Sequence, residues 1–526
     1  MKITIEKLTI AILMVCLSSC SSKKIPKTHS NQNKPNVLVI MVDQLNVNAL
    51  SCYGGEMQTP NIDRLANEGV RFDRAYCTTP FCSPSRASIV TGQYLHEHGI
   101  VQNMGWRQKD GITIDDETTE KILSENGYET HHYGKWHVES DSLPYLPYYP
   151  DQYDFGYQYK KEANESGVTL KKADSDEYMN FYGQSFPVEG TPYMKGKREH
   201  LDSIWSSIEY RDFVTKMGRL KIKPEEWIDG ILAKKTIARI KESGETNDPF
   251  MLTCSFIWPH DPNFAPSPYY EMFNPDSLKI PEFNTPEQKF ENSWSRRMVN
   301  GYGDEGLKEF LRIYHANVKY LDDRIGEILG ELEAQGKLDE TLIIFTADHG
   351  DMMGEHGMTW KSNESFYEAI ANIPFIIRYP KLFKPGVSSM PISLVDIKPT
   401  ILSVVGEEYK AKVSGTNIVP FFTGEKSMTD APKYSFCERI QYHPEGKREI
   451  LSTAKGAFMV RNDRYKLNIY PDGDVFLYDL ENDPNEMKNV IDNPKFTQDV
   501  LELEEALSEW LKTTNWKGVP VKFKYL

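Results

Sequence analysis

The chain is poor in cysteine for a protein of its length, with seven in 526 residues. Two of these, Cys16 and Cys20, lie in an N-terminal segment that we expect to be processed. The five that remain are scattered along the chain: Cys52, Cys77, Cys82, Cys254 and Cys437. This spacing excludes the disulfide framework of a small secreted domain. The 31 prolines and 34 glycines are also dispersed, and the sequence has neither a low-complexity linker nor a fixed-period repeat.

Positive charge is in deficit as well. The 61 lysines and arginines are outnumbered by 76 aspartates and glutamates, which gives a formal net charge of −15 at pH 7. Nucleic acid is therefore not expected as a partner, because the electrostatic attraction that drives such binding would have the wrong sign. A small anionic substrate remains compatible with this charge, since a local cluster of Lys, Arg and His can override the global field.

The N-terminal apolar run, over residues 8–17, is too short to cross a bilayer as a permanent helix. It follows two lysines and is typical of the apolar core of a signal peptide. The small residues directly before Cys20 resemble a bacterial lipoprotein signal, in which this cysteine is lipidated. An ordinary cleaved secretory signal is the alternative. We therefore expect a signal peptide over 1–19, a polar tether over 20–34, and an exported lipoprotein in the periplasm or at the cell surface, with no other membrane contact.

Four continuous apolar runs have the character of strands buried on both faces of a parallel sheet. Each run ends abruptly in polar or charged residues. The runs and the residues that follow them are Val37–Val42 before Asp43-Gln44, Phe250–Ile257 before Trp258-Pro259-His260-Asp261, Leu342–Thr346 before Ala347-Asp348-His349, and Pro374–Ile377 before Arg378.

Amphipathic helices are predicted between these runs. The clearest covers Leu307–Gln335, with Gly336 after its end. Apolar strands that alternate with such helices predict a doubly wound α/β fold around a mixed, mostly parallel sheet. Sheets of this kind bind ligands beyond the carboxyl ends of their strands. Four reactive side chains fall at that position: Asp43, His260, Asp348 and His349.

The texture of the sequence changes near residue 426. Before it, residues 35–425 have the pattern of one large α/β domain, which we expect to be catalytic. After it, short strand-like pieces separated by Asp, Gly and Pro turns precede a final helix, predicted over 497–512. Residues 426–526 are therefore expected to form a smaller C-terminal α+β subdomain with an antiparallel sheet. Residues 150–225, which have weak periodicity, are expected to form a long insertion at the edge of the sheet or over the active site.

The segment Cys82-Ser83-Pro84-Ser85-Arg86 has the strongest chemical character. Pro84 and Ser85 favour the start of a helix, so Cys82 would lie where backbone N–H groups and the helix dipole favour an anion. Arg86 adds a permanent charge with bidentate geometry. A cysteine in this place is either a nucleophile of low pKa or a buried structural residue, and the segment alone does not distinguish the two.

The pattern Cys-x-Pro-Ser-Arg, followed by Ala-Ser and Thr-Gly, resembles the signature of the formylglycine-dependent type I sulfatases of the alkaline phosphatase superfamily. Further motifs in the order of that family run through almost the whole mature chain: Pro35–Gln44, Thr59–Leu65, Gly134–His137, Pro259–Pro262, Thr346–Asp351, Lys361, Leu394–Asp396 and Leu477–Leu480.

This resemblance implies a sulfuric ester hydrolase in which Cys82 is oxidised to formylglycine by a separate maturation enzyme. By the mechanism of the family, the aldehyde is hydrated to a gem-diol, one hydroxyl attacks sulfur, and the other then collapses to expel sulfate. A serine at the same place would leave a stable sulfate ester, which explains the need for the unusual residue.

The resemblance also implies a divalent metal held by Asp43, Gln44, Asp348 and His349. The commoner set in the family has three Asp and one Asn, so the ligand charge here is −2 instead of −3. Mostly oxygen ligands favour Ca²⁺, with Mg²⁺ as an alternative, and the imidazole makes Mn²⁺ more plausible than usual.

The other residues that match the family surround the expected sulfate. Lys135 and Lys361 would bind sulfate oxygens, and Arg86 would hold the diol and the carboxylates. His137 would hydrogen-bond to the diol. We expect His260 to be the general acid on the leaving oxygen, because an imidazole changes protonation state near neutral pH.

The expected substrate is a sulfated sugar from a polysaccharide, because an exported hydrolase is well placed to trim such oligosaccharides. Choline sulfate is an alternative, since Pro259–Pro262 resembles a stretch of choline sulfatases. Phosphonate and phosphate ester hydrolases of the same superfamily are a second alternative, because some share the Asp-Gln and Asp-His metal set. A catalytically inactive binding lipoprotein is a third. No feature of the sequence predicts an oligomeric state.

Overall fold

The computed structural model of the chain describes residues 34–138, 143, 178–181, 184–192, 216–281 and 288–526, except 106, 247, 292 and 362–364. The predicted signal peptide over 1–19, the lipidation site Cys20 and nearly all of the tether over 20–34 lie outside the described residues. Most of the insertion predicted over 150–225 also lies outside them. Residues 35–526 form one compact unit.

A seven-stranded mixed sheet lies at the centre of this unit. Three of its strands are buried along their whole length, as their continuous apolar sequences predict. Each buried Val, Ile or Leu side chain stabilises the fold by about 1.5–3 kcal/mol. From one edge to the other the strands are β12 (Gly386–Ser388), β2 (Val70–Phe72), β11 (Phe375–Arg378), β10 (Thr341–Ala347), β1 (Asn36–Asp43), β8 (Phe250–Pro259) and β4 (Glu129–Gly134).

The directions of the strands confirm the predicted mixed, mostly parallel sheet. Strand β1 is parallel to both β10 and β8, and β8 is parallel to β4. Strand β11 is an exception, because it runs antiparallel to β10 and to β2. The apolar run Pro374–Ile377 predicts this buried strand but not its direction, because an apolar run reports only the burial of both faces. The connection from β10 to β11 includes the short helix α11 (Glu368–Ala371).

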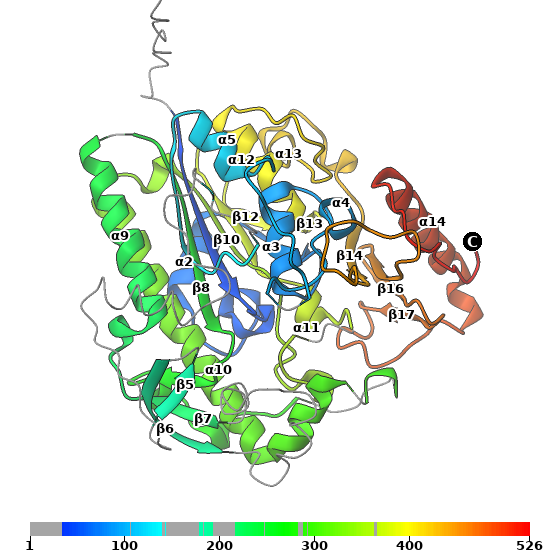
Figure 1. Ribbon diagram of the computed structural model, residues 1–526, viewed down its shortest axis with the longest axis horizontal. Coiled ribbons are helices and arrows are strands. Elements are labelled where there is room, and N and C mark those ends of the chain that lie inside the picture. The colour runs from blue at the N-terminus through cyan, green and yellow to red at the C-terminus, as the bar shows by residue number, and fades with distance from the viewer. Residues whose placement is uncertain are drawn as a thin grey trace, which may run out of the picture. The chain divides into compact units, whose positions relative to one another are not determined.

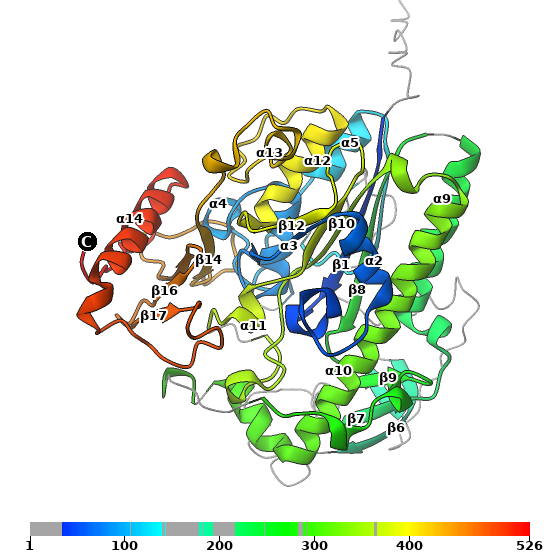
Figure 2. The ribbon, with the colours of Figure 1, turned by 180° about the vertical axis from the view of Figure 1, so that it is seen from behind.

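Helices cover both faces of the sheet (Figures 1 and 2). This arrangement confirms the doubly wound architecture. One face is covered by α2 (Pro60–Glu68), α9 (Ile228–Thr246) and α10 (Trp294–Ala334). The opposite face is covered by α3 (Cys82–Thr91), α5 (Thr119–Glu125), α12 (Ile397–Val405) and α13 (Val419–Thr423), with the short helix α4 (Leu95–His98) beside α3.

Helix α10 begins earlier than the sequence predicts. We expected it to start near Leu307, whereas it extends back to Trp294 across a break at Gly303, whose φ of 65° is non-helical. The glycines in this stretch interrupt the apolar periodicity, so the pattern reported only the part after the break. The end agrees with the prediction, because Gly336 follows with a positive φ of 66°.

The C-terminal residues form a second sheet with its own hydrophobic core (Figure 1). Four antiparallel strands pair in sequence order, and the final helix packs on them. This is the antiparallel sheet and helix that the change of texture after residue 426 predicts. The elements are β14 (Ser435–Ile440), β15 (Gly456–Arg461), β16 (Tyr465–Ile469), β17 (Val475–Asp479) and α14 (Thr497–Thr513).

Two smaller sheets complete the described elements. A four-stranded sheet contains β5 (Tyr178–Phe181), β6 (Gln184–Pro192), β7 (Lys216–Leu220) and β9 (Phe264–Pro266), and a two-stranded sheet contains β3 (Ala75–Tyr76) and β13 (Ile392–Ser393). Among the described residues, no helix combines the length and the apolar character that a membrane crossing requires.

Candidate active site

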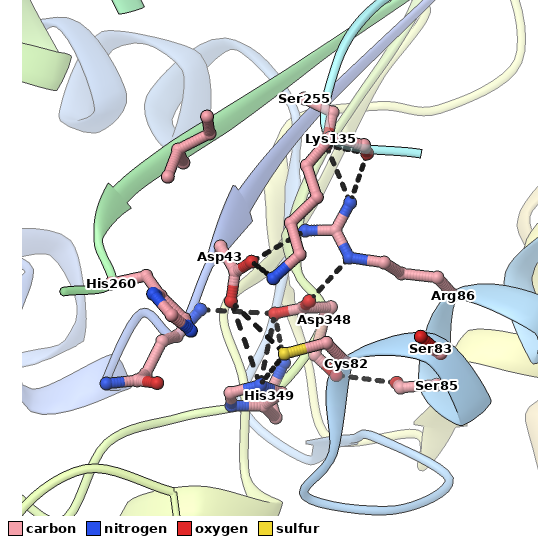
Figure 3. A network of polar contacts seen from close by, with 12 residues as sticks. Asp43, Cys82, Ser83, Ser85, Arg86, Lys135, Ser255, His260, Asp348 and His349 are labelled. Atoms are coloured by element: carbon pink, nitrogen blue, oxygen red, sulfur yellow. Dashed lines mark hydrogen bonds and ion pairs between the residues drawn. The ribbon is translucent and has the colours of Figure 1, made fainter. Parts of the chain in front are cut away.

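The side chains predicted for the site come together at the carboxyl edge of the central sheet (Figure 3). Strands β1, β8 and β10 end at this edge, and Asp43, His260 and Asp348 lie at or directly after their ends. Lys135 follows β4, and helix α3 begins at Cys82. Neighbouring parallel strands point the same way, so the residues that follow them converge on one place.

Arg86 joins the two carboxylates of the site. Its Nε donates to Asp348 Oδ2 at 2.7 Å, and its Nη2 donates to Asp43 Oδ2 at 3.3 Å. Its Nη1 donates to the backbone oxygen of Lys135 and to Ser255 Oγ. All of the guanidinium nitrogens thus have partners, so this side chain holds the carboxylates in fixed positions.

The position of Lys135 depends on the residue before it. Gly134 has a φ of 98°, and a Cβ at this position would lie 1.9 Å from the backbone oxygen of Ser255. Only glycine fits this close approach, which turns the chain so that Lys135 Nζ pairs with Asp43. Burial favours the neutral form of Asp43, but the cations Lys135, His260 and Arg86 lower the pKa of this carboxyl to about 2.

Cys82 lies among positive groups and is fully buried. Its Sγ is 3.2 Å from His349 Nε2, 3.3 Å from Lys361 Nζ and 3.7 Å from Asp43 Oδ1. Burial opposes ionisation of the thiol, yet Lys135, Lys361 and His349 lower the pKa of Cys82 well below its usual value. The place of this side chain therefore favours negative charge.

The backbone N–H groups of α3 do not contribute to this preference in the way we expected. Ser83 N donates to Asn103 Oδ1 at 3.1 Å, Pro84 has no N–H, and Ser85 N donates to the backbone oxygen of Phe81. The prediction that these groups bind an anion at Cys82 was wrong, because the N–H groups after Cys82 already have partners or are absent. The positive charge comes from side chains.

Four side chains present donor atoms that all lie within 4.8 Å of one another: Asp43, Cys82, Asp348 and His349. His349 Nδ1 is 2.9 Å from the backbone oxygen of Gly350, so its Nε2 is left to face the carboxylates. Burial disfavours the charged imidazole, but Asp348 and Cys82 raise the pKa of His349. The spacing of the donors and this preference for positive charge fit a divalent cation.

Gln44 lies beside this set. Its Oε1 accepts a hydrogen bond from Lys361 Nζ at 3.3 Å, and its Nε2 donates to Asp351 Oδ2 at 2.6 Å. The amide oxygen therefore lies on the side of Lys361, whose ammonium also contacts Cys82.

His260 and Lys361 form the partly exposed side of the site. His260 Nε2 is 2.7 Å from Lys361 Nζ, and its Nδ1 is 3.0 Å from Asp261 Oδ1. Burial favours the neutral imidazole, but the Asp261 carboxylate raises the pKa of His260 to about 9. Asp261 thus favours the protonated ring. A proton on Nε2 would require Lys361 Nζ to give up its 2.7 Å contact, because both nitrogens would then be donors.

The pKa of His137 is shifted in the opposite direction to that of His260. This histidine is buried, with a φ of 63°, and burial together with the neighbouring Lys135 and Arg86 lowers the pKa of His137 to about 3. Two histidines of one site are thus held in different protonation states, which is a common property of acid–base catalysts.

Sequence reasoning missed the contributions of three residues. Asp261 and Asp351 lie inside motifs that we had singled out, yet neither was given a role. An acidic residue directly after a candidate histidine, or three residues after a candidate Asp, is a signal that would have found them. Asn103, which accepts from Ser83 N, has no such signal because it lies in a distant loop.

Comparisons with known proteins agree with this geometry. A model of the sulfatase family matches residues 35–407, and a model described as the C-terminal part of N-sulphoglucosamine sulphohydrolase matches residues 354–513. An N-acetylglucosamine-6-O-sulfatase from Bacteroides thetaiotaomicron is 29% identical, with 97% of this chain and 92% of that protein covered.

Solved structures have the same fold. A protein in complex with its substrate D-glucosamine-2-N,6-O-disulfate has a TM-score of 0.66 at 23% identity, covering 92% of this chain and 98% of that chain. A phosphonate monoester hydrolase from Silicibacter pomeroyi has a TM-score of 0.71 at 23% identity, covering 91% of this chain and 96% of that chain. At this identity, the likenesses establish the fold alone.

Proposed function

The chain belongs to the sulfatase family, and we propose that it hydrolyses sulfate esters on sugars derived from a sulfated polysaccharide. The observation that carries this proposal is the charge around Cys82. Arg86, Lys135 and Lys361 bring three permanent positive charges to this buried site. Arg86 and Lys135 pair with the carboxylates of Asp43 and Asp348, whereas Lys361 Nζ contacts Cys82 and Gln44. Fixed positive charge beside residue 82 stabilises a sulfate ester and the charge that develops on it. The N-acetylglucosamine-6-O-sulfatase among the relatives supports a sugar as the alcohol part.

Lys135 and Lys361 are the residues that we propose to bind the sulfate. Their ammonium groups lie beside Asp43 and Cys82, so an ester placed against residue 82 would contact both. Four of the five N–H groups of Arg86 donate to the carboxylates and to neighbouring oxygens. Its proposed role is therefore to keep the metal ligands in place.

The family implies a divalent metal, and we propose that Asp43, Gln44, Asp348 and His349 hold it. Two carboxylates and an amide oxygen favour Ca²⁺, while the imidazole leaves Mg²⁺ and Mn²⁺ as alternatives. When bound, such an ion would supply additional positive charge to the sulfate oxygens. The geometric support is the close spacing of the donors.

His260 is the general acid of this proposal. The pKa of about 9 keeps its ring protonated at neutral pH. Its Nδ1–H donates to Asp261, so the proton on Nε2 is the one available to the leaving alcohol oxygen. Because His260 lies at the partly exposed side of the site, the sugar would approach from there.

Formylglycine at position 82 would supply the nucleophile in its hydrated form, and Cys82 Sγ marks where its oxygens would lie. The neutral His137 is suited to accept a hydrogen bond from a hydroxyl at this place. Cys82 is 0% exposed in the folded protein. A maturation enzyme would therefore have to reach this residue before folding is complete.

Substitution of Cys82 tests the proposed function directly. Cys82→Ala, expressed with a maturation enzyme, is expected to lose turnover of sulfated mono- and disaccharides by a factor on the order of 10³ to 10⁶. Cys254→Ala is the matched control, because Cys254 is equally buried but lies within β8. Full turnover by Cys82→Ala would overturn the proposal.

A substrate panel separates the alternatives. Turnover of sulfated sugars above that of choline sulfate, a phosphate diester and a phosphonate monoester is expected. A preference for the phosphonate would instead favour the related ester hydrolases, and a preference for choline sulfate would replace the sugar.

We also propose that the protein is exported and anchored through a lipid on Cys20. The support is the order of basic, apolar and small residues before this cysteine. Cys20→Ala is expected to move the protein from the membrane fraction to the soluble exported fraction. Unchanged membrane association of this variant would exclude the anchor.

A further inference from the structure

The backbone of Gln44 is held in an unusual conformation. Its φ of 64° lies in the left-handed region, which residues other than glycine rarely adopt. Its N–H donates to Asp348 Oδ1 at 3.1 Å, and its carbonyl oxygen accepts from Tyr314 Oη at 2.6 Å. Both backbone groups are thus fixed, and the side chain leaves the end of β1 in one direction.

The side chain of Gln44 ends against the buried carboxylate of Asp351. Asp351 Oδ1 accepts from the backbone N–H groups of Met353 at 2.7 Å and Trp360 at 3.0 Å. Its Oδ2 accepts from Gln44 Nε2 at 2.6 Å. Since a carboxylate only accepts hydrogen bonds, it selects the NH₂ end of the amide.

This selection turns the amide oxygen of Gln44 to the other side. There Oε1 accepts from Lys361 Nζ, the same ammonium that contacts Cys82 Sγ. An amide oxygen can ligate a cation, whereas the amide nitrogen has no free lone pair for one. A reversed amide would therefore present two N–H groups where a metal ligand is needed.

We propose that Asp351 is a positioning residue that sets the orientation of the Gln44 amide and so delivers Oε1 to the divalent cation. This inference rests on the proposed function, because it takes Gln44 as a metal ligand. Asp351 itself lies one step behind the ligands, since its two oxygens are occupied by Met353 N, Trp360 N and Gln44 Nε2. Such partners behind a metal ligand commonly tune affinity by about 10–100-fold.

The test is the affinity for Ca²⁺ of the matured full-length protein, stripped with a chelator and titrated by calorimetry above neutral pH. Asp351→Asn can still accept from Met353 N and Trp360 N, but it presents an NH₂ group to Gln44. The amide of Gln44 then turns to accept this hydrogen bond, and its oxygen leaves the metal site. The expected result is an affinity about 10–100-fold weaker than that of the parent.

A second substitution, at position 44, should restore an oxygen that faces the cation. In Asp351→Asn combined with Gln44→Glu, one carboxylate oxygen accepts from the new amide and the other faces the cation. This double variant is expected to bind Ca²⁺ more tightly than Asp351→Asn and more tightly than Gln44→Glu alone. In the single Gln44→Glu variant two carboxylates meet and must share a proton, so the added acidic group should give no gain over the parent.

Asp322→Asn is the matched control. Asp322 is also fully buried, and its carboxylate also accepts two backbone N–H groups, those of Asn61 and Ile62 at the start of α2. This variant loses the same charge far from the metal ligands, so it should lower the unfolding temperature and leave the Ca²⁺ affinity unchanged.

Two results would overturn the role of Asp351 while leaving sulfatase function intact. One is parental affinity in Asp351→Asn, and the other is equal affinity of Asp351→Asn with and without Gln44→Glu. If Asp351→Asn does not fold, tighter Ca²⁺ binding by Gln44→Glu than by the parent would also contradict it. A parent that binds no divalent cation would overturn this inference together with the proposed metal site, whereas the Cys82→Ala assay tests the hydrolase independently.

Discussion

A comparison of two ionic clusters in the described part of the chain shows a difference in how their charges are paired. One contains Glu368, Arg461, Lys466 and Glu486 and joins the segment around α11 to the C-terminal sheet, so we call it the linkage cluster. Lys466 Nζ is 3.0 Å from Glu368 Oε1 and 2.5 Å from Glu486 Oε1, and Arg461 Nη1 is 3.0 Å from Glu368 Oε2. Two cations thus meet two carboxylates.

The active-site cluster is not paired in this way. Arg86 and Lys135 pair with the carboxylates of Asp43 and Asp348, whereas the described contacts of Lys361 Nζ are with Gln44, Cys82 and His260 instead of a carboxylate. Its donor atoms also converge on one place instead of pairing off. Removing charge from water costs several kcal/mol per ion, and an internal partner offsets this cost. A cluster that supplies every partner is structural, whereas one that leaves charge unmatched is prepared for a ligand.

The largest effect that this comparison predicts comes from two matched lysines. Lys135 and Lys466 are both buried and both pair with carboxylates. Lys135→Met should lower kcat by about 10²–10³, because a charge aimed at the sulfate is lost. Lys466→Met should instead lower the free energy of unfolding by about 3–5 kcal/mol, because the buried carboxylate of Glu486 loses its cation and Glu368 keeps only Arg461.

The measurements for this pair are steady-state kinetics per folded molecule and denaturant unfolding. Normal turnover by folded Lys466→Met is the expected control. If Lys135→Met kept its activity, or if Lys466→Met lost activity without losing stability, the distinction between the two clusters would fail.

Metal binding is expected to stabilise one cluster only. At a Ca²⁺ concentration 100 times its Kd, the protein should gain about 2.7 kcal/mol of unfolding free energy. Asp348→Asn should abolish this gain because it removes a proposed ligand, while Glu486→Gln in the linkage cluster should preserve it. Thermal unfolding with Ca²⁺ and with a chelator provides the comparison, and a gain that survives in Asp348→Asn would place the ion elsewhere.

The pH dependence of catalysis should also change only when a residue of the active-site cluster is substituted. With the pKa of His260 near 9, kcat/KM should fall as the pH rises through about 9, because the general acid loses its proton. The Asp261 carboxylate causes the upward shift, so Asp261→Asn should move this alkaline limb down toward 6.5, the ordinary value for histidine. The measurement is kcat/KM over this pH range for the parent, Asp261→Asn and the control Lys466→Met. An alkaline limb that does not move in Asp261→Asn would remove His260 as the acid.

The sequence predicted those features of the fold and the site that depend on residues close together in the chain. The apolar runs before Asp43 and Asp348 specify buried strands, and the convergence of their ends follows from parallel pairing. The direction of β11 did not follow, because an apolar run carries no information on direction. The use of Ser83 N by Asn103 could not be predicted either, since it joins a helix to a loop 20 residues away. The two clusters look alike in sequence, because charge balance appears only when distant residues meet.

The smallest predicted effect tests whether charged side chains or helix N–H groups bind the anion in the active site. Asn103→Ala removes the partner of Ser83 N at the start of α3, so the unfolding free energy should fall by about 0.5–2 kcal/mol, the range for a lost helix cap. The KM for a sulfated sugar should stay unchanged, because Lys135 and Lys361, not backbone N–H groups, are proposed to bind the anion. Kinetics and denaturant unfolding of this variant decide the matter. A KM below that of the parent would mean that the freed N–H binds sulfate, and that the start of α3 contributes to anion binding in this cluster beside the lysines.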